Sequence, residues 1–516
     1  MNDRDVVDRY HDGTKHRFDR FARSLGYLDW ASQPTPFRAY AGAPEISLRS
    51  EATGVADLLR HSLGLSAWKR FNATRWSLRV NPSSGNLHPT EAYVVGPDGV
   101  FHYAPDRHAL EHRCRCQPAL GDGRCLIALT SIHWREAWKY GERAFRYCQH
   151  DLGHAIAAIA IAAANAGMSA RVLSDWSHAD VAALTGVDRD EDFVGAEREE
   201  AGCVLAVGSH QSSGGSHQSS GGSLQSAVAR FSRQSVLDAV RGGAWMGCAS
   251  RLSEDHVEWP IIDEVARATR TRGDAGVLRS GAPLVGAATR YPRALILQRR
   301  SAVDLDGHSS IDRERFLDIL AQTMPSDAPP WNALAWDARI HLALFVHRVD
   351  GLDPGLYLLV RNVDAIDRLR AAIRRDFAWM PVTTDVPLFC LANGDARALA
   401  RRLSCDQDIA ANGFFSLGMI ADFDASLDEF GAAFYRSLFW ESGVVGQVLY
   451  LEAERAGARG TGIGCFYDDP VHDALGLTGH VFQSLYHFTI GIPVEDARLT
   501  TERGYEWEPS TSTGAP

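Results

Sequence analysis

Residues 153–167 read Gly-His-Ala-Ile-Ala-Ala-Ile-Ala-Ile-Ala-Ala-Ala-Asn-Ala-Gly. Alanine and isoleucine fill most of this run, which predicts a helix that is buried on every side rather than one with a solvent face. Gly167 stands where a left-handed glycine commonly ends a helix. Residues 443–457 repeat the pattern, again with a glycine at each end. We expect these two helices to pack against each other as the central contact of the molecule.

The two helices belong to a weak internal repeat. An ungapped shift of 290 positions matches residues 141–186 to residues 431–476 with eight identities, several of them glycines at helix ends. At a different shift, Gly99-Val-Phe-His-Tyr resembles Gly355-Leu-Tyr-Leu-Leu. Long-range repetition of this kind indicates that one fold has been duplicated and fused. We therefore predict a pseudo-dimer within one chain, and a further homodimer of such chains stays open.

Each half has the pattern of an α+β fold. Segments 91–95 and 340–346 are rich in β-branched and aromatic residues. Each leads through a turn containing Gly, Pro or Asp into a second strand, which predicts β-hairpins. We expect two similar α+β domains, each an antiparallel sheet flanked by helices.

A polar tract divides the chain. Residues 209–226 contain the heptapeptide SHQSSGG twice in succession. Such a Ser, Gly and Gln composition buries no apolar surface and predicts a flexible linker. Domain 1 then spans 1–208 and domain 2 spans 227–516, with 227–290 as an N-terminal helical extension of domain 2.

The composition excludes several classes of protein. Acidic residues outnumber basic ones by 64 to 53, the net charge is −11, and the bases form no long run that could follow a phosphate backbone. No stretch approaches the ~18 apolar residues of a membrane span, and the first residues lack the apolar core of a signal peptide. The nine cysteines are scattered, which fits a reducing compartment. We expect a cytoplasmic protein with no nucleic-acid or membrane partner.

Three segments carry residue types suited to a ligand. Residues 75–89 include a Pro-Ser-Ser-Gly-Asn loop whose amides and hydroxyls can approach a planar or anionic ligand. Residues 299–301 are Arg-Arg-Ser, which matches the several oxygens of a terminal phosphate. Residues 457–466 hold four glycines within eight positions, which permit positive φ and leave amides exposed to cofactor heteroatoms. The plainer interpretations are a polar turn for the first segment and a solvated arginine pair for the second.

Other motifs are weaker. The glycine segment follows a helix rather than opening one, so it does not predict a Rossmann site. Cys465 could act as a nucleophile, but nothing in the sequence lowers its pKa, so we expect only its backbone to take part. The sequence His150-Asp-Leu-Gly-His154 departs from the zinc-protease pattern, and we expect no metal.

Taken together, the three segments resemble the FMN-dependent nitroreductase superfamily. In that family an Arg-Arg-Ser element holds the FMN phosphate, a Pro-Ser-x-x-Asn-x-x-Pro loop covers the flavin, and a glycine-bearing loop after a long helix donates amides near flavin N5 and O4. The loop at 82–89 looks most like the SagB-type (azoline) dehydrogenase branch. The resemblance covers nearly the whole chain in two copies.

The family elements are divided between the halves. The second half has Arg-Arg-Ser and the glycine loop, but residues 324–331 at its loop position read Met-Pro-Ser-Asp-Ala-Pro-Pro-Trp. The first half has the intact loop, but residues 167–172 after its helix lack the glycine cluster. The resemblance therefore implies one composite FMN site between the halves. A mirror site at residues 37–40 and the degenerate loops is expected to be empty.

The resemblance also implies which residues bind the cofactor. The family often has a further base two residues after Arg-Arg-Ser, but here that position is Val303. Arg75, Arg79 and Arg498 are therefore candidates to complete the neutralisation of the phosphate. The full candidate set is Arg75, Arg79, Pro82, Ser83, Ser84, Gly85, Asn86, Arg299, Arg300, Ser301, Gly462, Ile463, Gly464, Cys465 and Arg498.

The implied activity is that of an FMN-dependent oxidoreductase that passes hydride through flavin N5, without a catalytic side chain. Two reactions stay open: a nitro- or quinone-type reductase with NADH or NADPH as donor, and a SagB-type dehydrogenase. The substrate would be a small molecule or a peptide-derived compound. A non-catalytic flavin-binding or scaffold protein is the alternative.

Overall fold

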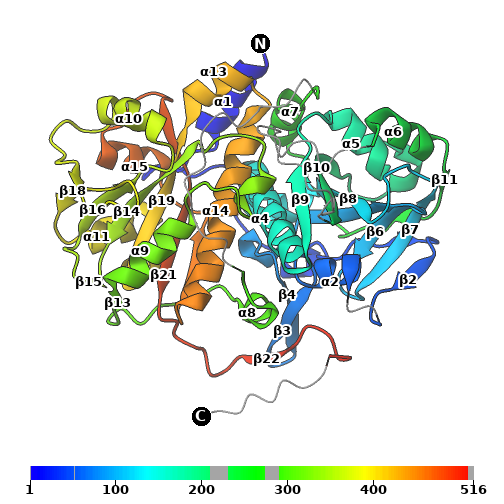
Figure 1. Cartoon of the computed structure of the whole chain (residues 1–516), viewed down its shortest axis with the longest axis horizontal. Coiled ribbons are helices and arrows are strands. Elements are labelled where there is room, and N and C mark those ends of the chain that lie inside the picture. Colours follow the sequence, from blue (N-terminus) through cyan, green and yellow to red (C-terminus); the bar gives the residue numbers. More distant parts are fainter. Residues whose placement is uncertain (1, 51–52, 210–230, 274–289, 509–516) are drawn as a thin grey trace, which may run out of the picture.

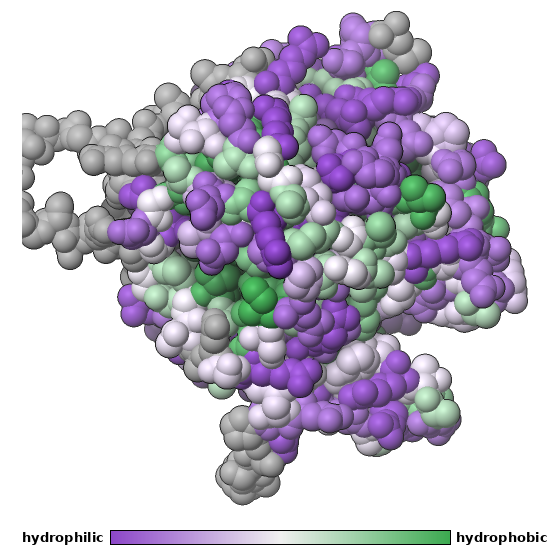
Figure 2. All heavy atoms as spheres, turned by 90° about the vertical axis from the view of Figure 1, so that its right-hand side faces the viewer, coloured by the Kyte–Doolittle hydropathy of each residue, from purple (hydrophilic) through white to green (hydrophobic). Residues whose placement is uncertain are grey.

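The computed structural model of the chain describes residues 2–50, 53–209, 231–273 and 290–508. Figure 1 shows a β-sheet on each side of the molecule and two long helices between the sheets, α4 (Ala144–Asn165) and α14 (Phe434–Arg455). Hydrophilic side chains cover most of the face built by the first half, with smaller hydrophobic areas between them (Figure 2). In the residues described, no helix is long and apolar enough to cross a membrane.

The first sheet has, within the described residues, eight antiparallel strands. Seven follow the order β11-β7-β6-β5-β8-β10-β9, and β2 pairs with β7. Strands β5 and β6 form one of the two predicted hairpins. The bounds are β2 Glu45–Ser47, β5 Thr90–Gly96, β6 Gly99–Ala104, β7 Ala109–Arg115, β8 Arg124–Ser131, β9 Met168–Val172, β10 Glu200–Ser209 and β11 Ala244–Trp245.

The second sheet has seven antiparallel strands in the described part of the chain, in the order β17-β18-β16-β14-β19-β21-β20. Strands β14 and β16 pair as the other predicted hairpin. The bounds are β14 Ile340–Val346, β16 Gly355–Leu359, β17 Met380–Pro381, β18 Leu388–Asn393, β19 Phe415–Asp422, β20 Arg459–Ile463 and β21 Phe482–Gly491.

Both sheets are connected to their helices in the same sequence. After β8, α3 (His133–Tyr140), α4, edge strand β9 and α5 (His178–Thr185) precede β10. After β19, α13 (Phe423–Phe430), α14, edge strand β20 and α15 (Asp468–Leu475) precede β21. The two halves thus share one topology.

Helices α4 and α14 cross at a glycine contact. Residues 144–163 of α4 are all buried, as the apolar run predicts, and Gly167 and Gly457 follow the two helices at φ +73°. A Cβ built on Gly443 would lie 2.8 Å from the Cα of Gly153. Glycines at this crossing therefore let the backbones meet. Both helices begin nine residues, or about two and a half turns, earlier than the glycines that open the sequence pattern.

The ends of the described chain cross between the halves. Helix α1 (Asp3–Gly13) lies against the second half, where His11 Nε2 is 2.9 Å from Gln483 Oε1. Strand β22 (Thr500–Arg503) pairs with β3 (Leu65–Phe71), which pairs with β4 (Thr74–Arg79). These exchanged segments tie each half to the other.

One segment is assigned to the wrong half by the sequence analysis. Residues 231–273, expected as an extension of the second domain, lie on the first half. Strand β11 extends the first sheet beside β7, and β12 (Cys248–Ala249) pairs with β1 (Tyr40–Ala41). Helix α6 (Arg233–Arg241) packs on α5, and α7 (Pro260–Ala268) packs on α1 and α4. Apart from Ser209, at the end of β10, the predicted linker 209–226 lies outside the described residues.

Shorter elements complete the fold. They are α2 Gly54–Arg60, α8 Arg293–Gln298, β13 Ile311–Asp312, α9 Arg313–Gln322, β15 Val349–Asp350, α10 Ile366–Ala372, α11 Arg397–Leu403 and α12 Ile409–Asn412. Helix α8 leads into the Arg-Arg-Ser segment, and α11 leads into a turn that contacts Cys465.

Candidate functional site

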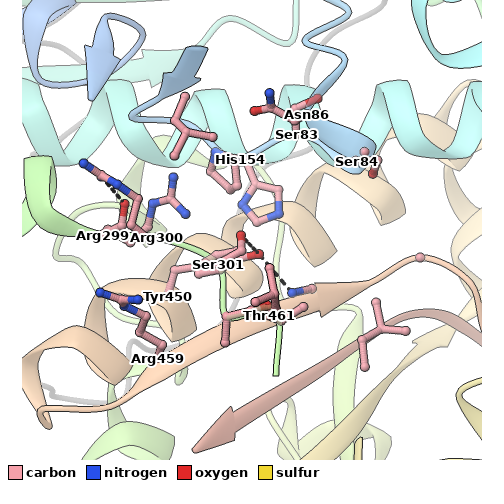
Figure 3. Close-up of a pocket in the computed structure, with 18 of the residues that line it drawn as sticks. Ser83, Ser84, Asn86, His154, Arg299, Arg300, Ser301, Tyr450, Arg459 and Thr461 are labelled. Carbon is pink, nitrogen blue, oxygen red and sulfur yellow. Dashed lines mark hydrogen bonds between the residues drawn. The ribbon is translucent and has the colours of Figure 1, made fainter. Parts of the chain in front are cut away.

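A cavity of about 460 Å³ lies between the halves, beside α4 and α14. The loop at 81–86 lines it from the first half, and segments 299–303 and 461–465 line it from the second. Figure 3 shows Arg299, Arg300 and Arg459 gathered at one end and the loop residues Ser83 and Asn86 toward the other. A volume of this size is within the range of small-molecule and cofactor sites.

Thirteen of the fifteen residues predicted from sequence line this cavity. They are Arg79, Pro82, Ser83, Ser84, Gly85, Asn86, Arg299, Arg300, Ser301, Gly462, Ile463, Gly464 and Cys465. The structure therefore brings together segments that are more than 200 residues apart in the chain.

Arg75 and Arg498 do not line the cavity, and the sequence prediction is wrong for them. Arg75 stacks over the ring of Trp68 and pairs with Glu502 at 3.0 Å, because β4 points its side chain along the β3–β22 sheet. Arg498 has a side chain that is 74% exposed and pairs with Asp496 at 2.7 Å. Each guanidinium is already paired with a carboxylate, although Arg75 shares Glu502 with Arg70.

Arg299 is buried without an anionic partner. It is 3% exposed, its Nη2 donates to the backbone oxygen of Arg79 at 3.1 Å, and its Nε and Nη1 have no hydrogen-bond partner. In the described part of the chain, neither guanidinium group of Arg299 and Arg300 forms an ion pair; the nearby Glu454 carboxylate accepts from the backbone nitrogen of Arg300 at 3.1 Å instead. Burying an unpaired charge is costly, so this end of the cavity is suited to an anion.

The neighbouring cations strengthen this preference. Arg300 donates to the backbone oxygens of Leu297 and Ser66 at 2.8 and 3.1 Å. Burial, followed by the positive charge of Arg299, lowers the pKa of Arg300 to about 10. Lys69 and Arg459 also line the cavity, and both escaped the sequence analysis. Arg459 lies within the glycine segment itself, so its place in the sequence could have marked it as a cavity residue.

The Arg-Arg-Ser segment runs beside the glycine strand. Ser301 forms a parallel bridge with Gly460, and its Oγ lies 2.9 Å from Tyr450 Oη. The same tyrosine oxygen accepts from Gly462 N at 2.9 Å (Figure 3). The expectation that this amide is free for a cofactor is therefore wrong.

The glycines of residues 457–464 mostly serve close packing rather than positive φ. Of the four, Gly457 alone has positive φ. A Cβ on Gly462 would lie 1.9 Å from Tyr486 Oη, and one on Gly464 would lie 2.2 Å from Tyr147 Cε1. Two tyrosine rings press on the strand, which explains the glycines without a left-handed turn.

The loop at 82–86 is held by its own side chains. Gly85 and Asn86 have φ of 59° and 61°. Asn86 Nδ2 donates to the backbone oxygen of Ser77 at 2.8 Å, and its Oδ1 lies 2.9 Å from His88 Nε2. Ser83 Oγ accepts from His88 N at 2.8 Å. These polar groups fix the loop's shape, so its backbone forms much of the cavity surface.

Two buried acids lie behind the loop. Asp151, on α4, lines the cavity, and its Oδ1 accepts from Ser84 N at 3.3 Å. Glu136 Oε1 lies 3.5 Å from Ser83 Oγ. The other oxygen of each carboxyl has no hydrogen-bond partner. Burial raises the pKa of Asp151 to about 7 and also raises the pKa of Glu136, so a proton is held beside the cavity near neutral pH.

Cys465 differs from its sequence expectation. Its Sγ lies 2.9 Å from Cys405 Sγ and 3.7 Å from His16 Nδ1. Hydrogen bonding to Cys405, and then to His16, lowers the pKa of Cys465 to about 5. No local motif indicated this, because both partners are distant in sequence.

The predicted mirror site is not assembled. Residues 324–326 and 328–331 line a separate cavity of about 310 Å³, to which residues 37–40 do not contribute. Arg38 is buried on the first half instead, with its Nε 3.3 Å from Glu199 Oε1. Its charge is already paired, so it is not available to a ligand.

Part of the first half matches a known protein family. Residues 100–208 match the nitroreductase family. This part of the chain is a nitroreductase domain. It contains α3 and α4, and so it contributes Tyr140 from α3 and Tyr147, Asp151 and His154 from α4 to the cavity. Among curated proteins, none matches the chain significantly.

Solved structures extend the likeness beyond the nitroreductase domain. A protein of Anabaena variabilis named as a candidate nitroreductase has a TM-score of 0.70 and 21% identity, covering 95% of this chain and 99% of that one. At this identity the likeness shows the fold, and it shows it over both halves.

Two further structures share part of the fold. The microcin synthetase complex McbBCD of E. coli, with truncated pro-MccB17 bound, has 15% identity, a TM-score of 0.30, and coverage of 48% of this chain and 85% of that one. An FMN-dependent nitroreductase of Clostridium difficile has 11% identity, a TM-score of 0.22, and coverage of 39% and 86%. Nothing about function follows from scores this low.

Proposed function

We propose that the chain is an FMN-dependent oxidoreductase with one flavin site shared between its two halves. The nitroreductase domain supports a flavin-dependent oxidoreductase. The observation that carries the finer proposal is Arg299, which is buried beside Arg300 with no hydrogen-bond partner at Nε and Nη1 and no ion pair to a carboxylate. A phosphate group would supply the missing anion through bidentate contacts.

The residues present fit this cofactor. Arg299, Arg300 and Ser301 would hold the phosphate, with Lys69 adding positive charge. Arg459 lines the same end of the cavity but already pairs with Glu495. The loop at 82–86 and the strand at 462–465 would enclose the ring, because they line the rest of the same cavity. When bound, FMN supplies hydride chemistry at its N5 atom.

The protein's own residues would orient and protect this chemistry. Tyr140, Tyr147 and Tyr486 line the cavity and reduce the access of water. Asp151 holds a proton near neutral pH on an oxygen that has no other partner. A proton source beside the ring suits reactions in which the acceptor gains a hydride and a proton.

We further propose that the two halves are copies of one fold, packed as an intramolecular pseudo-dimer. Their shared strand order, the glycine crossing of α4 and α14, and the exchanged end segments support this. The proposed units are 1–208 and the chain after the linker 209–226, with residues 231–273 completing the first unit. The molecular mass in solution would show whether two such chains associate into a homodimer.

For the reaction, we propose reduction of a nitro or quinone compound with NADH or NADPH as donor. The second candidate is SagB-type dehydrogenation of a peptide-derived substrate, favoured by the sequence of the loop at 82–89. We propose a cytoplasmic location with no nucleic-acid or membrane partner, in keeping with the net charge of −11.

The test begins with the purified full-length chain. We expect a yellow protein with one FMN per chain that bleaches anaerobically on addition of NADH or NADPH. A protein that stays colourless after incubation with FMN would refute the proposal. Colour without bleaching by either nicotinamide, but with bleaching by a heterocyclic peptide, would select the SagB-type reaction. Colour that no donor bleaches would favour a non-catalytic flavin-binding protein.

A further inference from the structure

Two cysteines meet at the edge of the cavity, although they are 60 residues apart in the chain. Cys405 follows α11 and Cys465 follows β20, and their sulfur atoms are 2.9 Å apart. Both are free thiols. Cys465 lines the cavity proposed to hold the flavin, so the pair has direct access to that site.

Two hydrogen bonds hold the segments of the two cysteines together. Tyr467 N donates to the backbone oxygen of Leu403 at 2.8 Å, and Gln407 Nε2 donates to the backbone oxygen of Cys465 at 3.0 Å. These bonds join the two segments on either side of the thiols. The contact between the two sulfur atoms therefore depends on hydrogen bonds between the segments that carry them, and not only on the rotamers of the two cysteines.

The turn that carries Cys405 is strained. Cys405 and the next residue, Asp406, have φ of +56° and +58°, which is the left-handed region that side chains with a Cβ rarely adopt. Such strain persists only where surrounding contacts impose it, and it concentrates at functional sites. Here it directs Cys405 toward Cys465.

The groups around the pair favour a reactive thiolate. His16 Nδ1 lies 3.7 Å from Cys465 Sγ, and because burial lowers the pKa of His16, this residue acts as a hydrogen-bond partner and not as a fixed positive charge. The guanidinium of Arg143, which hydrogen bonds to Asp468 at 2.9 Å, adds positive charge on the same side. The lowered pKa of Cys465 agrees with this setting, and the thiolate is the form of cysteine that attacks sulfur and flavin.

A metal ion is the competing occupant of this cluster. His16, Cys405 and Cys465 place three ligand atoms within 4.8 Å of one another. Two sulfur ligands of a tetrahedral zinc ion, each about 2.3 Å from the metal, would be about 3.8 Å apart. The observed separation of 2.9 Å is shorter, and the charge of Arg143 opposes a second cation. The geometry is closer to that of a thiol pair able to bond.

We propose that Cys405 and Cys465 form a redox-active dithiol that exchanges two electrons with the flavin in the adjoining cavity. This inference rests on the proposed function, since the flavin is its electron acceptor. In the forward direction, the Cys465 thiolate and the Cys405 thiol form one S–S bond. Two electrons and the Cys405 proton pass to the oxidised flavin, which becomes the anionic two-electron-reduced form. In the reverse direction, reduced flavin reopens the disulfide.

The first experiment uses the full-length apoprotein and so does not depend on the flavin. After treatment with oxidised dithiothreitol, we expect peptide mass spectrometry to find a Cys405–Cys465 cross-link. Cys405→Ser and Cys465→Ser should each abolish it. Cys248→Ser, which changes an exposed thiol outside the cavity, should leave it unchanged. Absence of the cross-link from the wild type would overturn the proposal and leave the flavin site intact.

The second experiment uses the flavin-loaded chain without oxygen. When prereduced protein is freed of reductant and mixed with FMN, we expect one flavin to be bleached for each cross-link formed, and no bleaching in either serine variant. A cross-link without bleaching would mean a structural disulfide and overturn the exchange. Thiols that resist oxidation until a chelator removes one zinc per chain would overturn it in favour of a metal site. Failure of FMN to bind would refute the proposed function and the exchange with it, while the apoprotein cross-link would still be measured.

Discussion

Gly153 on α4 and Gly443 on α14 lie back to back where the two helices cross, so that a Cβ on Gly443 would stand 2.2 Å from the backbone oxygen of His150. The same crossing carries Trp440, whose Nε1 donates to Gln149 Oε1 at 2.9 Å. Helices α4 and α14 also contribute Asp151 and Tyr450 to the lining of the cavity, so a change at the crossing would move residues of the site. The close packing that glycine permits at the crossing therefore affects the position of residues in the cavity as well as the packing of the core.

Gly443→Ala is expected to push the helices apart and destabilise the protein by about 1–3 kcal/mol, as overpacking of a dense core does. Urea denaturation gives the change in the free energy of unfolding. Gly96→Ala is the control, because a Cβ there meets nothing within 4 Å. Equal stability of the Gly443 variant and the wild type would contradict the close crossing.

Arg299→Ala is expected to weaken FMN binding about 10- to 150-fold, since a hydrogen bond to a charged group contributes about 1.5–3 kcal/mol. Riboflavin lacks the phosphate, so its affinity should change little. Fluorescence titration with both ligands measures the difference. Arg75→Ala, outside the cavity, should behave as wild type. A similar loss for riboflavin and FMN would show that Arg299 does not contact the phosphate.

Asn86→Ala should lower FMN retention about tenfold or more, although Asn86 and Arg299 belong to different halves, because one side-chain hydrogen bond contributes about 0.5–1.5 kcal/mol and this variant loses two. The bonds lost are those to Ser77 and His88 that hold the loop. Asn86→Gly keeps the positive φ and separates backbone strain from the lost bonds. Normal retention in both variants, measured by FMN release on gel filtration, would argue against a site shared by the two halves.

The buried carboxyl of Asp151 predicts a pH dependence of stability. Its pKa is about 7 in the folded chain because of burial, against ~3.9 for an unfolded aspartate. Between these values the folded protein holds a proton that the unfolded chain has released. The free energy of unfolding of the apoprotein should therefore fall as the pH rises from ~4 toward ~7.

Asp151→Asn removes this titration and should flatten the profile, which urea denaturation over that pH range would reveal. Glu136→Gln should flatten it further, since burial also raises the pKa of Glu136. An unchanged slope in Asp151→Asn would show that Asp151 is not protonated in the folded state. The exposed Asp190→Asn serves as control.

Much of the fold could be predicted from local pattern. The alanine-rich run around Gly153 and its counterpart around Gly443 indicate buried helices by composition, and glycine after each marks the end by its freedom at positive φ. The hairpins follow from strand-forming residues on either side of a turn. The packing of residues 231–273 could not be predicted, because β11 and β12 are two residues long and depend wholly on their partners β7 and β1.

Some residues of the candidate site could likewise be predicted from the sequence, and others could not. Residue type located the loop at 82–86 and the Arg-Arg-Ser segment, since hydroxyls and guanidiniums suit phosphate wherever they occur. Residue type could not separate Arg299 from Arg75 and Arg498. What separates them is whether a carboxylate stands nearby, as Glu502 does for Arg75, and that depends on pairing between strands distant in the sequence.

The two buried helices, the hairpins and the segments that carry ligand chemistry follow from local sequence, because they depend on neighbours within a few residues. Which charges stay unpaired, which acid holds a proton and which thiols meet depends on the folded arrangement of the chain. Desolvation and Coulomb interactions act through space, so Arg299, Asp151 and the Cys405–Cys465 pair acquire their properties from residues that the chain brings to them by folding.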